Sequence, residues 1–373
     1  MPIKTAKGFS KLSKEAKMEW IVNEYLGGDD TNIKLLKSYW HNDAETQKIH
    51  DEFIENTITN FYIPFGVAPN FLINDRIYCV PMAIEESSVV AAAAKNASFW
   101  MERGGFKSTV ISTIKIGHVH FAWYGEFSTL KNFVNSIKDK FYSETESITA
   151  NMRSRGGGIK DINVVDRSDL EPNYYQLEAK FETCDAMGAN FINSCLEIIS
   201  KKFKQFLNES SEFKESEKKI EIIMSILSNY TPECIVESSI QCKVDDLGDI
   251  DGMSSKVFAL KFKEAFDIAN VDIGRAVTHN KGIMNGVDAV LISTGNDFRA
   301  VEAGVHAFAS RKGKYKSLSE CTITDNMFKV NLKIPLSIGT VGGITDIHPM
   351  VKLSLRMLKN PTSDDLMNII SSV

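Results

Sequence analysis

A lysine and an aspartate in the C-terminal half of the chain could carry out chemistry on a carbonyl group. Lys281 lies in the glycine-containing segment 278–286, and Asp297 follows Gly295. The glycines predict two separate polar turns on either side of the apolar run 287–292. A lysine beside an apolar segment can aim its ammonium at a developing oxyanion, and a nearby carboxylate keeps that ammonium charged. We therefore expect the pair to stabilise negative charge on a reacting oxygen.

Both residues also have explanations that need no catalysis. A lone Lys281 is most often a solvated lysine, and a lone Asp297 is most often the N-cap of a helix, here over residues 298–309. If one straight helix joined the two, the sixteen positions between 281 and 297 would put them on nearly opposite faces, at about 100° per residue. The intervening glycines relieve this constraint by allowing turns.

A second group of polar residues stands where a predicted strand meets an alanine-rich helix. Glu86, the second of two adjacent glutamates, is either a first-turn carboxylate favoured by the helix dipole or a general acid whose pKa is raised by burial in a crevice. Ser88 offers a hydroxyl donor to the same crevice. Arg275 is a candidate clamp for an anion through its planar guanidinium. These residues extend the candidate site beyond the lysine and the aspartate.

Small residues in other segments could let a nucleotide approach the backbone. The segment 185–190 begins a predicted helix, where exposed N–H groups can bind a phosphate or ribose, although tight packing of the helix on a sheet explains them equally well. Segment 339–343 is a backbone-exposing turn that is ambiguous alone, and 156–158 is more often a flexible turn. The GxGxxG fingerprint of Rossmann folds is absent.

Metal-dependent and hydrolytic chemistry find little support. His118 and His120 share one face of a predicted strand, but no third ligand is apparent, so we expect no metal site. No GxSxG elbow is present for a serine hydrolase. The six cysteines form no CxxC pair, which favours reduced thiols.

Composition and charge disfavour several classes of partner. The chain has 373 residues, which predicts two to three domains of an ordinary globular protein. Its net charge of -5 argues against nucleic acid, because no basic surplus exists to neutralise phosphates. With no uncharged apolar run of about 18 residues and no leader, we expect no membrane span and a cytoplasmic protein.

Hydrophobic periodicity predicts an α+β fold with an inserted domain. A hairpin is predicted over 71–84, with its turn at Asn74 and Asp75. A strand region over 110–123 then begins a series of strand, helix, strand, strand, helix and strand that ends near residue 226. That order is the split βαβ, ferredoxin-like arrangement. We expect it to span 108–228, inserted between the two parts, 1–107 and 229–373, of a helix-rich large domain.

Several of these segments together resemble the 3-hydroxy-3-methylglutaryl-CoA (HMG-CoA) reductase family. The resemblance covers the chain from about residue 10 to its last residue, in family order. It is carried by Glu55-Asn56, by 63–68 (IPFGVA) and 81–93 (PMAIEESSVVAAA), and by 185–190, 279–286, 294–297 and 339–343. The chain is most similar to the class II, bacterial branch, which lacks a membrane anchor and has a compact ferredoxin-like cofactor domain.

The resemblance implies a reversible four-electron interconversion of mevalonate plus coenzyme A and HMG-CoA, with two nicotinamide equivalents. It implies that Lys281 stabilises the thioester oxyanion, that Glu86 donates the proton, and that Asp297 tunes both. The residues that it implies for substrate binding are Ser88, Arg275, Asn285 and Asn229. Because the family builds its site across a subunit interface, a homodimer or higher homo-oligomer is expected.

The resemblance also suggests how the cofactor is chosen. The residues that it implies for cofactor binding are Asp161, Asp185, Met187, Gly188 and Asn190. Asp161 would accept hydrogen bonds from a ribose 2′-OH and repel a 2′-phosphate, which favours NAD over NADP. The neighbouring Lys160 would soften that rejection, so NADP stays possible.

One part of the family pattern is not matched. The family has a catalytic histidine in a mobile C-terminal flap, in a segment that would follow Val373, and no histidine of this chain corresponds to it. We expect a chain whose flap is missing to bind HMG-CoA or mevalonate but to turn over slowly. The alternatives are a catalytically impaired homologue that binds coenzyme A or nucleotide, and another NAD-dependent hydroxy-acid oxidoreductase.

Overall fold

The computed structural model describes residues 5–373, and contacts between Cα atoms divide the chain into two units. The first unit ends at Pro64 and the second comprises Phe65–Val373. In the first, the cap residues Ser13, Asp29 and Asp43 each accept a hydrogen bond from a backbone N–H of the following helix. Its elements are η1 (Phe9–Lys11), α1 (Lys14–Tyr25), α2 (Asp30–Ser38) and α3 (Ala44–Asp51). The sequence predicts a helix-rich first part of the large domain over 1–107, but not the separation of its N-terminal helices into a unit.

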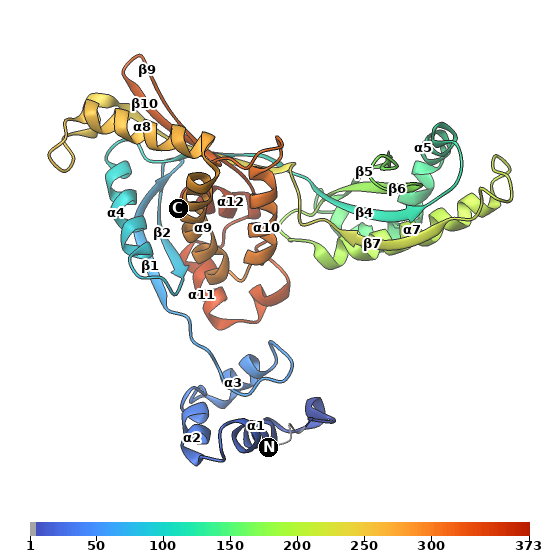
Figure 1. Cartoon of the computed structure of the whole chain (residues 1–373), viewed down its shortest axis with the longest axis horizontal. Coiled ribbons are helices and arrows are strands. Elements are labelled where there is room, and N and C mark those ends of the chain that lie inside the picture. Colours follow the sequence, from blue (N-terminus) through green and yellow to red (C-terminus); the bar gives the residue numbers. More distant parts are fainter. Residues whose placement is uncertain (1–4) are drawn as a thin grey trace. The chain divides into compact units, whose positions relative to one another are not determined.

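The second unit contains the predicted hairpin and a four-stranded sheet (Figure 1). The hairpin pairs β1 (Phe65–Ile73) with β2 (Arg76–Ala83), and both turn residues, Asn74 and Asp75, have the positive φ of a tight hairpin turn. The sheet has the order β3-β8-β10-β9 and is antiparallel. Its strands are β3 (Lys107–Thr113), β8 (Cys234–Lys243), β9 (Ser319–Thr324) and β10 (Met327–Pro335).

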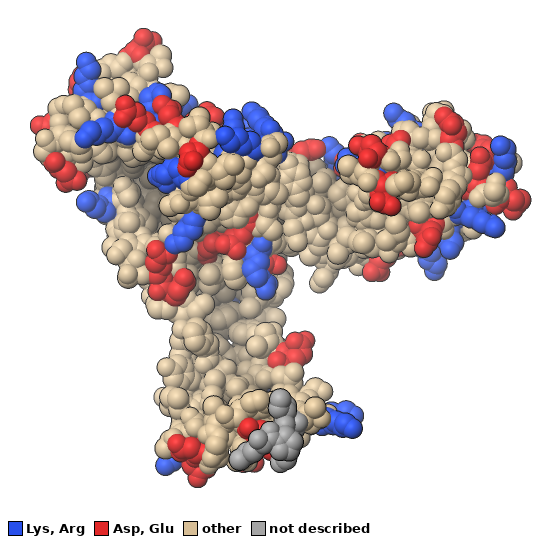
Figure 2. Space-filling model, viewed as in Figure 1, with Lys and Arg blue, Asp and Glu red and all other residues tan. Residues whose placement is uncertain are grey.

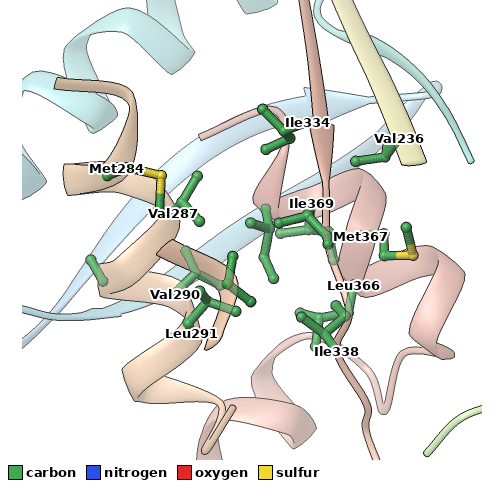
Figure 3. Packing of buried hydrophobic residues seen from close by; sticks show 14 of the residues in the cluster. Val236, Met284, Val287, Val290, Leu291, Ile334, Ile338, Leu366, Met367 and Ile369 are labelled. Carbon is green, nitrogen blue, oxygen red and sulfur yellow. The ribbon is translucent and has the colours of Figure 1, made fainter. Parts of the chain in front are cut away.

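Helices pack against these strands and against one another. Figure 3 shows buried side chains of α9 facing those of α12, with β8 and β10 beside them. Burying one such aliphatic side chain contributes about 1.5–3 kcal/mol, so this core fixes α9 firmly. The helical elements are α4 (Val89–Met101), η2 (Val244–Leu247), α8 (Ser255–Val271), α9 (Ile273–Ser293), α10 (Phe298–Ala309), η3 (Gly343–Asp346), α11 (Pro349–Met357) and α12 (Ser363–Ile370).

The inserted ferredoxin-like domain is confirmed. Its sheet has the order β5-β6-β4-β7 with every neighbouring pair antiparallel, and α5 and α7 bury one apolar stripe each against it. The stripes run from Leu130 to Phe141 and from Ile192 to Phe206, and they belong to the two helices that the sequence predicts in this domain. The elements are β4 (Lys115–Ala122), α5 (Phe127–Glu144), α6 (Glu146–Arg153), β5 (Gly158–Asp166), β6 (Tyr174–Glu182), α7 (Ala189–Glu209) and β7 (Glu221–Leu227).

The predicted strand region over 110–123 is wrong as a single element. It comprises β3, which pairs with β8 in the large sheet, and β4, which pairs with β6 and β7 in the ferredoxin-like sheet. Only Ile114 separates the two strands. Alternation of side chains is the same on either side of this residue, so periodicity alone does not show where the chain leaves one sheet for another.

The predicted turn around Lys281 is also wrong. α9 runs without interruption through Gly282 and Gly286, and Asp272 caps its start by accepting the N–H of Arg275 at 2.7 Å. Gly286 is buried, and a Cβ there would lie 3.0 Å from the carbonyl carbon of Val373. Close packing, rather than a turn, therefore explains this glycine.

Charges on the surface are mixed. On the face seen in Figure 2, Lys and Arg side chains alternate with Asp and Glu over both the large and the ferredoxin-like domains. Within residues 5–373, no helix is long and apolar enough to cross a membrane.

Substitution of Gly105, which follows the C-terminus of α4, tests how closely this segment packs against Leu72 of the hairpin. Its φ is +72°, and a Cβ there would overlap both the carbonyl oxygen and the side chain of Leu72. Gly104 also has a positive φ, but the space around it is open. Both Gly→Ala changes carry the strain of a left-handed residue, about 1–2 kcal/mol. We expect Gly105→Ala to lose a further 1–3 kcal/mol, roughly, by overpacking.

Urea unfolding of the two variants measures this difference in the free energy of unfolding. Gly104→Ala is the matched control, because it shares the backbone strain without the overlap. Equal loss of stability in both variants would contradict the packing described for Gly105.

Candidate active site

Lys281 and Glu86 meet, as predicted. Nζ of Lys281 lies 2.5 Å from Oε2 of Glu86, although the two residues are 195 positions apart in the chain. Lys281 comes from the first half of α9, and Glu86 comes from the corner between β2 and α4. Their side chains are 59% and 45% exposed, so a ligand can reach both.

A hydrogen bond connects this corner with α9. Ser293, at the end of α9, donates its hydroxyl to the carbonyl oxygen of Pro81 in β2 at 2.9 Å.

Ser88 is the N-cap of α4, yet its φ is +71° and its side chain makes no capping hydrogen bond. Left-handed backbone in a residue other than glycine is strained, and such strain clusters at functional sites. The Ser88 hydroxyl is thereby left available to a ligand instead of being used in the helix cap.

A cleft of about 420 Å³ lies between α4 and α9 beside this pair. Glu86, Ser88 and Asn285 line it, so the structure brings together three of the predicted residues next to Lys281. Small residues leave room along both helices. Those that line the cleft are Ala92 and Ala93 of α4 and Gly282 and Gly286 of α9.

Arg275 is not among the residues that line this cleft. It lies in the first turn of α9, six residues before Lys281, which corresponds to about 9 Å along the helix axis. Its backbone N–H is used by the cap at Asp272. The predicted anion clamp therefore has no support from the geometry of the single chain.

Asp297 lies beyond the opposite end of α9. The helix continues for twelve residues from Lys281 to Ser293, or about 18 Å. Asp297 caps α10 by accepting the N–H of Ala300 at 3.2 Å, which is the structural alternative considered for it. Within one chain, about 18 Å of helix therefore separates Lys281 from the segment that leads to Asp297.

Asn229 is associated with α10 rather than with Lys281. It is exposed in the segment after β7, and a Cβ on Gly304 of α10 would lie 2.7 Å from its carbonyl oxygen. Asn229 and Asp297 are therefore both neighbours of α10. Apart from Arg275, the residues predicted for catalysis and substrate binding form two groups, one around Lys281 and one at α10.

The predicted nucleotide segments 185–190 and 339–343 pack against each other. The carbonyl oxygen of Asp185 accepts the N–H of Thr340 at 2.8 Å, and its carboxylate accepts the N–H of Ser363 at 2.8 Å. A Cβ on Gly339 would overlap the backbone around Met187. Gly188, with φ +89°, begins α7, and Asn190 is exposed in the first turn. Tight packing, the second explanation offered for these small residues, is what this geometry shows.

Lys115, which sequence analysis missed, supports this junction. Its buried ammonium donates to Oγ1 of Thr183 at 2.5 Å and to the carbonyl oxygen of Ala186 at 3.1 Å. Burial lowers the pKa of Lys115, and neighbouring acidic groups oppose that shift. The sequence contains one signal that could have identified Lys115: it is a lysine at a strand position whose side chain faces the interior.

Asp161 already has donors on both carboxylate oxygens. Its Oδ1 accepts from Nζ of Lys138 at 3.1 Å, and its Oδ2 accepts from Asn163 at 2.6 Å. Burial would raise the pKa of Asp161, but these hydrogen bonds and the charge of Lys138 outweigh it and lower the pKa. Lys160, the cation that the sequence suggests here, instead donates to the carbonyl oxygen of Gly156 at 2.9 Å. The basic neighbour of Asp161 is Lys138 of α5.

Comparison with known proteins agrees with this architecture. A family model described as "Hydroxymethylglutaryl-coenzyme A reductase" matches residues 16–373. The chain is 32% identical over 367 residues to the 3-hydroxy-3-methylglutaryl-coenzyme A reductase of Archaeoglobus fulgidus, a match that covers 98% of this chain and 79% of that protein. It is 31% identical over 375 residues to a probable reductase of Borreliella burgdorferi, covering 100% and 82%.

Solved structures give the same result. The 3-hydroxy-3-methylglutaryl-coenzyme A reductase of Streptococcus pneumoniae is 31% identical, with a TM-score of 0.81 over 99% of this chain and 96% of that one. The class II enzyme of the same species bound to NADPH gives a TM-score of 0.80 with the same identity and coverage. The chain therefore belongs to the hydroxymethylglutaryl-coenzyme A reductase family of NAD(P)-dependent oxidoreductases.

Proposed function

We propose that Lys281 and Glu86 are the reacting pair of this hydroxymethylglutaryl-CoA reductase. Lys281 stabilises the thioester oxyanion and later the aldehyde oxygen, and Glu86 donates the proton. The observation that carries this proposal is the 2.5 Å contact between Nζ of Lys281 and Oε2 of Glu86 beside the cleft. A fixed cation and a proton source are what the reduction of a thioester requires of the protein.

We assign different residues of the cleft to different parts of the substrate. Ser88 and Asn285 line it next to Glu86, so we assign them to the hydroxyl side of the HMG group. The small residues of α4 leave space for the acyl chain and the pantetheine arm of coenzyme A, our proposed co-substrate. Arg275 remains a proposal for the HMG carboxylate that rests on the family resemblance alone.

The nicotinamide cofactor would supply the hydride. Segment 339–343 shows whether the backbone leaves room for its phosphates. Gly342 and Gly343 have positive φ and open space where a Cβ would stand, so a phosphate can approach the backbone there. Asp185 and Thr340 line a cavity of about 670 Å³ that also carries Lys352 and Arg356. These residues suit a dinucleotide. We propose that Asp185, Met187, Gly188 and Asn190 position it.

We further propose that a second copy of the chain completes the active site. Ile273 and Val277 are 51% and 50% exposed and lie eight and four residues before Lys281, on the same face of α9. An apolar strip that leads to a functional lysine suits a subunit interface. Asp297 and Asn229, which one chain holds far from its own Lys281, would then serve the lysine of its partner.

Substitution of Lys281 tests the first proposal. We expect Lys281→Ala to lower kcat of NAD(H)-linked oxidation of mevalonate with coenzyme A by a factor of about 10²–10³, because one oxyanion donor is lost. Lys204→Ala, which removes an exposed lysine of α7, is the control and should keep wild-type activity. Unchanged kcat in Lys281→Ala would overturn the assignment.

Mixed oligomers test the second proposal. We expect Lys281→Ala and Asp297→Asn chains, each inactive alone, to regain activity when unfolded and refolded together. In a hybrid dimer, one of the two sites then has the intact lysine of one chain and the intact aspartate of the other.

Glu86→Gln mixed with Lys281→Ala is the matched control. Since Glu86 and Lys281 meet within one chain, every site of that hybrid keeps a defect and no activity should return. No recovery in the first mixture, with soluble hybrids present, would contradict a shared site.

Cofactor choice gives a further prediction. We propose NAD(H) as the preferred cofactor and Asp161 as the residue that binds its ribose 2′-OH. We propose that Lys138 lets NADP(H) bind as well, because its ammonium contacts the carboxylate of Asp161. Asp161→Ala should raise the ratio of kcat/KM for NADPH to that for NADH, and Lys138→Ala should lower it. Lys160→Ala is the control and should leave the ratio near that of wild type. Equal ratios in all variants would rule out Asp161 as the discriminator.

A further inference from the structure

A third polar residue continues the functional face of α9. Asp288 lies seven residues after Lys281 and three after Asn285, which places all three on one side of the helix. The distance from Lys281 along the axis is about 10 Å. Lys281 and Asn285 have proposed roles at the cleft, but Asp288 has none in the mechanism.

The surroundings of Asp288 are acidic. Its Oδ1 is buried and accepts no hydrogen bond from any group in the described part of the chain. The groups that face it are the carboxyl of Glu302 on α10, which is within hydrogen-bonding reach, and Glu85 from the corner between β2 and α4. Ionised carboxylates only accept hydrogen bonds, so two of them can bond to each other only if one carries a proton.

The energetics favour retention of that proton. Burial, the charge and hydrogen bond of Glu302, and the charge of Glu85 raise the pKa of Asp288 to about 8. Two adjacent carboxyls that share a site lose their protons in two separated steps, because the second negative charge is repelled by the first.

We propose that Asp288 and Glu302 share one proton at neutral pH, and that this pair positions Glu85, and with it Glu86, against α9. Glu85 precedes Glu86 directly, so a full second negative charge on the pair would repel the corner that carries the proposed proton donor. The pair also connects α10, which Asp297 caps, with α9. This inference rests on the proposed role of Glu86.

Two substitutions separate a proton-holding role from simple packing. Asp288→Asn has the same shape and keeps a donor toward Glu302, whereas Asp288→Ala removes both. We expect Asp288→Asn to retain kcat within about tenfold at pH 7, and Asp288→Ala to lose more. In wild type, kcat should fall as pH rises through about 8, where the pair loses its proton. In Asp288→Asn, this alkaline fall should be absent or moved to higher pH.

Thermal melting tests the proton independently of activity. The pKa of Asp288 is raised from 3.8 to about 8 in the folded protein. Between these two pH values the folded state holds one proton more than the unfolded state, so the stability of wild type falls as pH rises. The Tm of Asp288→Asn relative to wild type should therefore rise between about pH 4 and pH 8 and stay level above it. A Tm difference that does not change with pH would overturn the shared proton.

Infrared difference spectra complete the test with wild-type protein. A protonated-carboxyl band that disappears on titration through about pH 8, and that is absent in Asp288→Asn, would support the pair. If the band is present but the alkaline limb of kcat is the same in wild type and Asp288→Asn, the positioning role is wrong. If Glu86→Gln keeps wild-type activity, the proposed function itself fails, whatever the band shows.

Discussion

The contact between α9 and the corner after β2 is the interaction on which the rest of the site depends. One face of α9 is held in the core by Met284, Val287 and Leu291, and the neighbouring face presents Lys281 to Glu86. Because a helix with one face locked in a core cannot rotate, the lysine is aimed by packing that lies far from any substrate. The cleft, the acidic pair at Asp288 and the apolar strip before Lys281 are all arranged along this one element.

The length of α9 also explains why the predicted residues form two groups. Lys281 lies in its first half, whereas Asp297 follows its end and caps α10. Because α9 continues for about 18 Å beyond Lys281 before the chain turns toward Asp297, the two side chains lie apart within one chain. An assembly in which each chain offers Asp297 to another lysine satisfies both the family pattern and the geometry.

The sequence predicts those parts of the structure that depend on local periodicity. The apolar stripes of α5 and α7 identify the ferredoxin-like domain, and Asn74-Asp75 identifies the hairpin. It does not predict the division at Ile114, because strand alternation is the same in both sheets. The turn expected at Gly282 and Gly286 is wrong, because burial of the helix outweighs the weak helix propensity of glycine. Pairs such as Lys138 with Asp161 are tertiary contacts that no local pattern reports.

A crystal structure of the oligomer with bound HMG-CoA tests the central claim most directly. The account predicts that the thioester oxygen lies within about 3 Å of Nζ of Lys281, with Glu86 on its other side. It also predicts that the aspartate near this oxygen belongs to the partner chain. A thioester oxygen bound away from Lys281, with that lysine facing only solvent, would contradict the account.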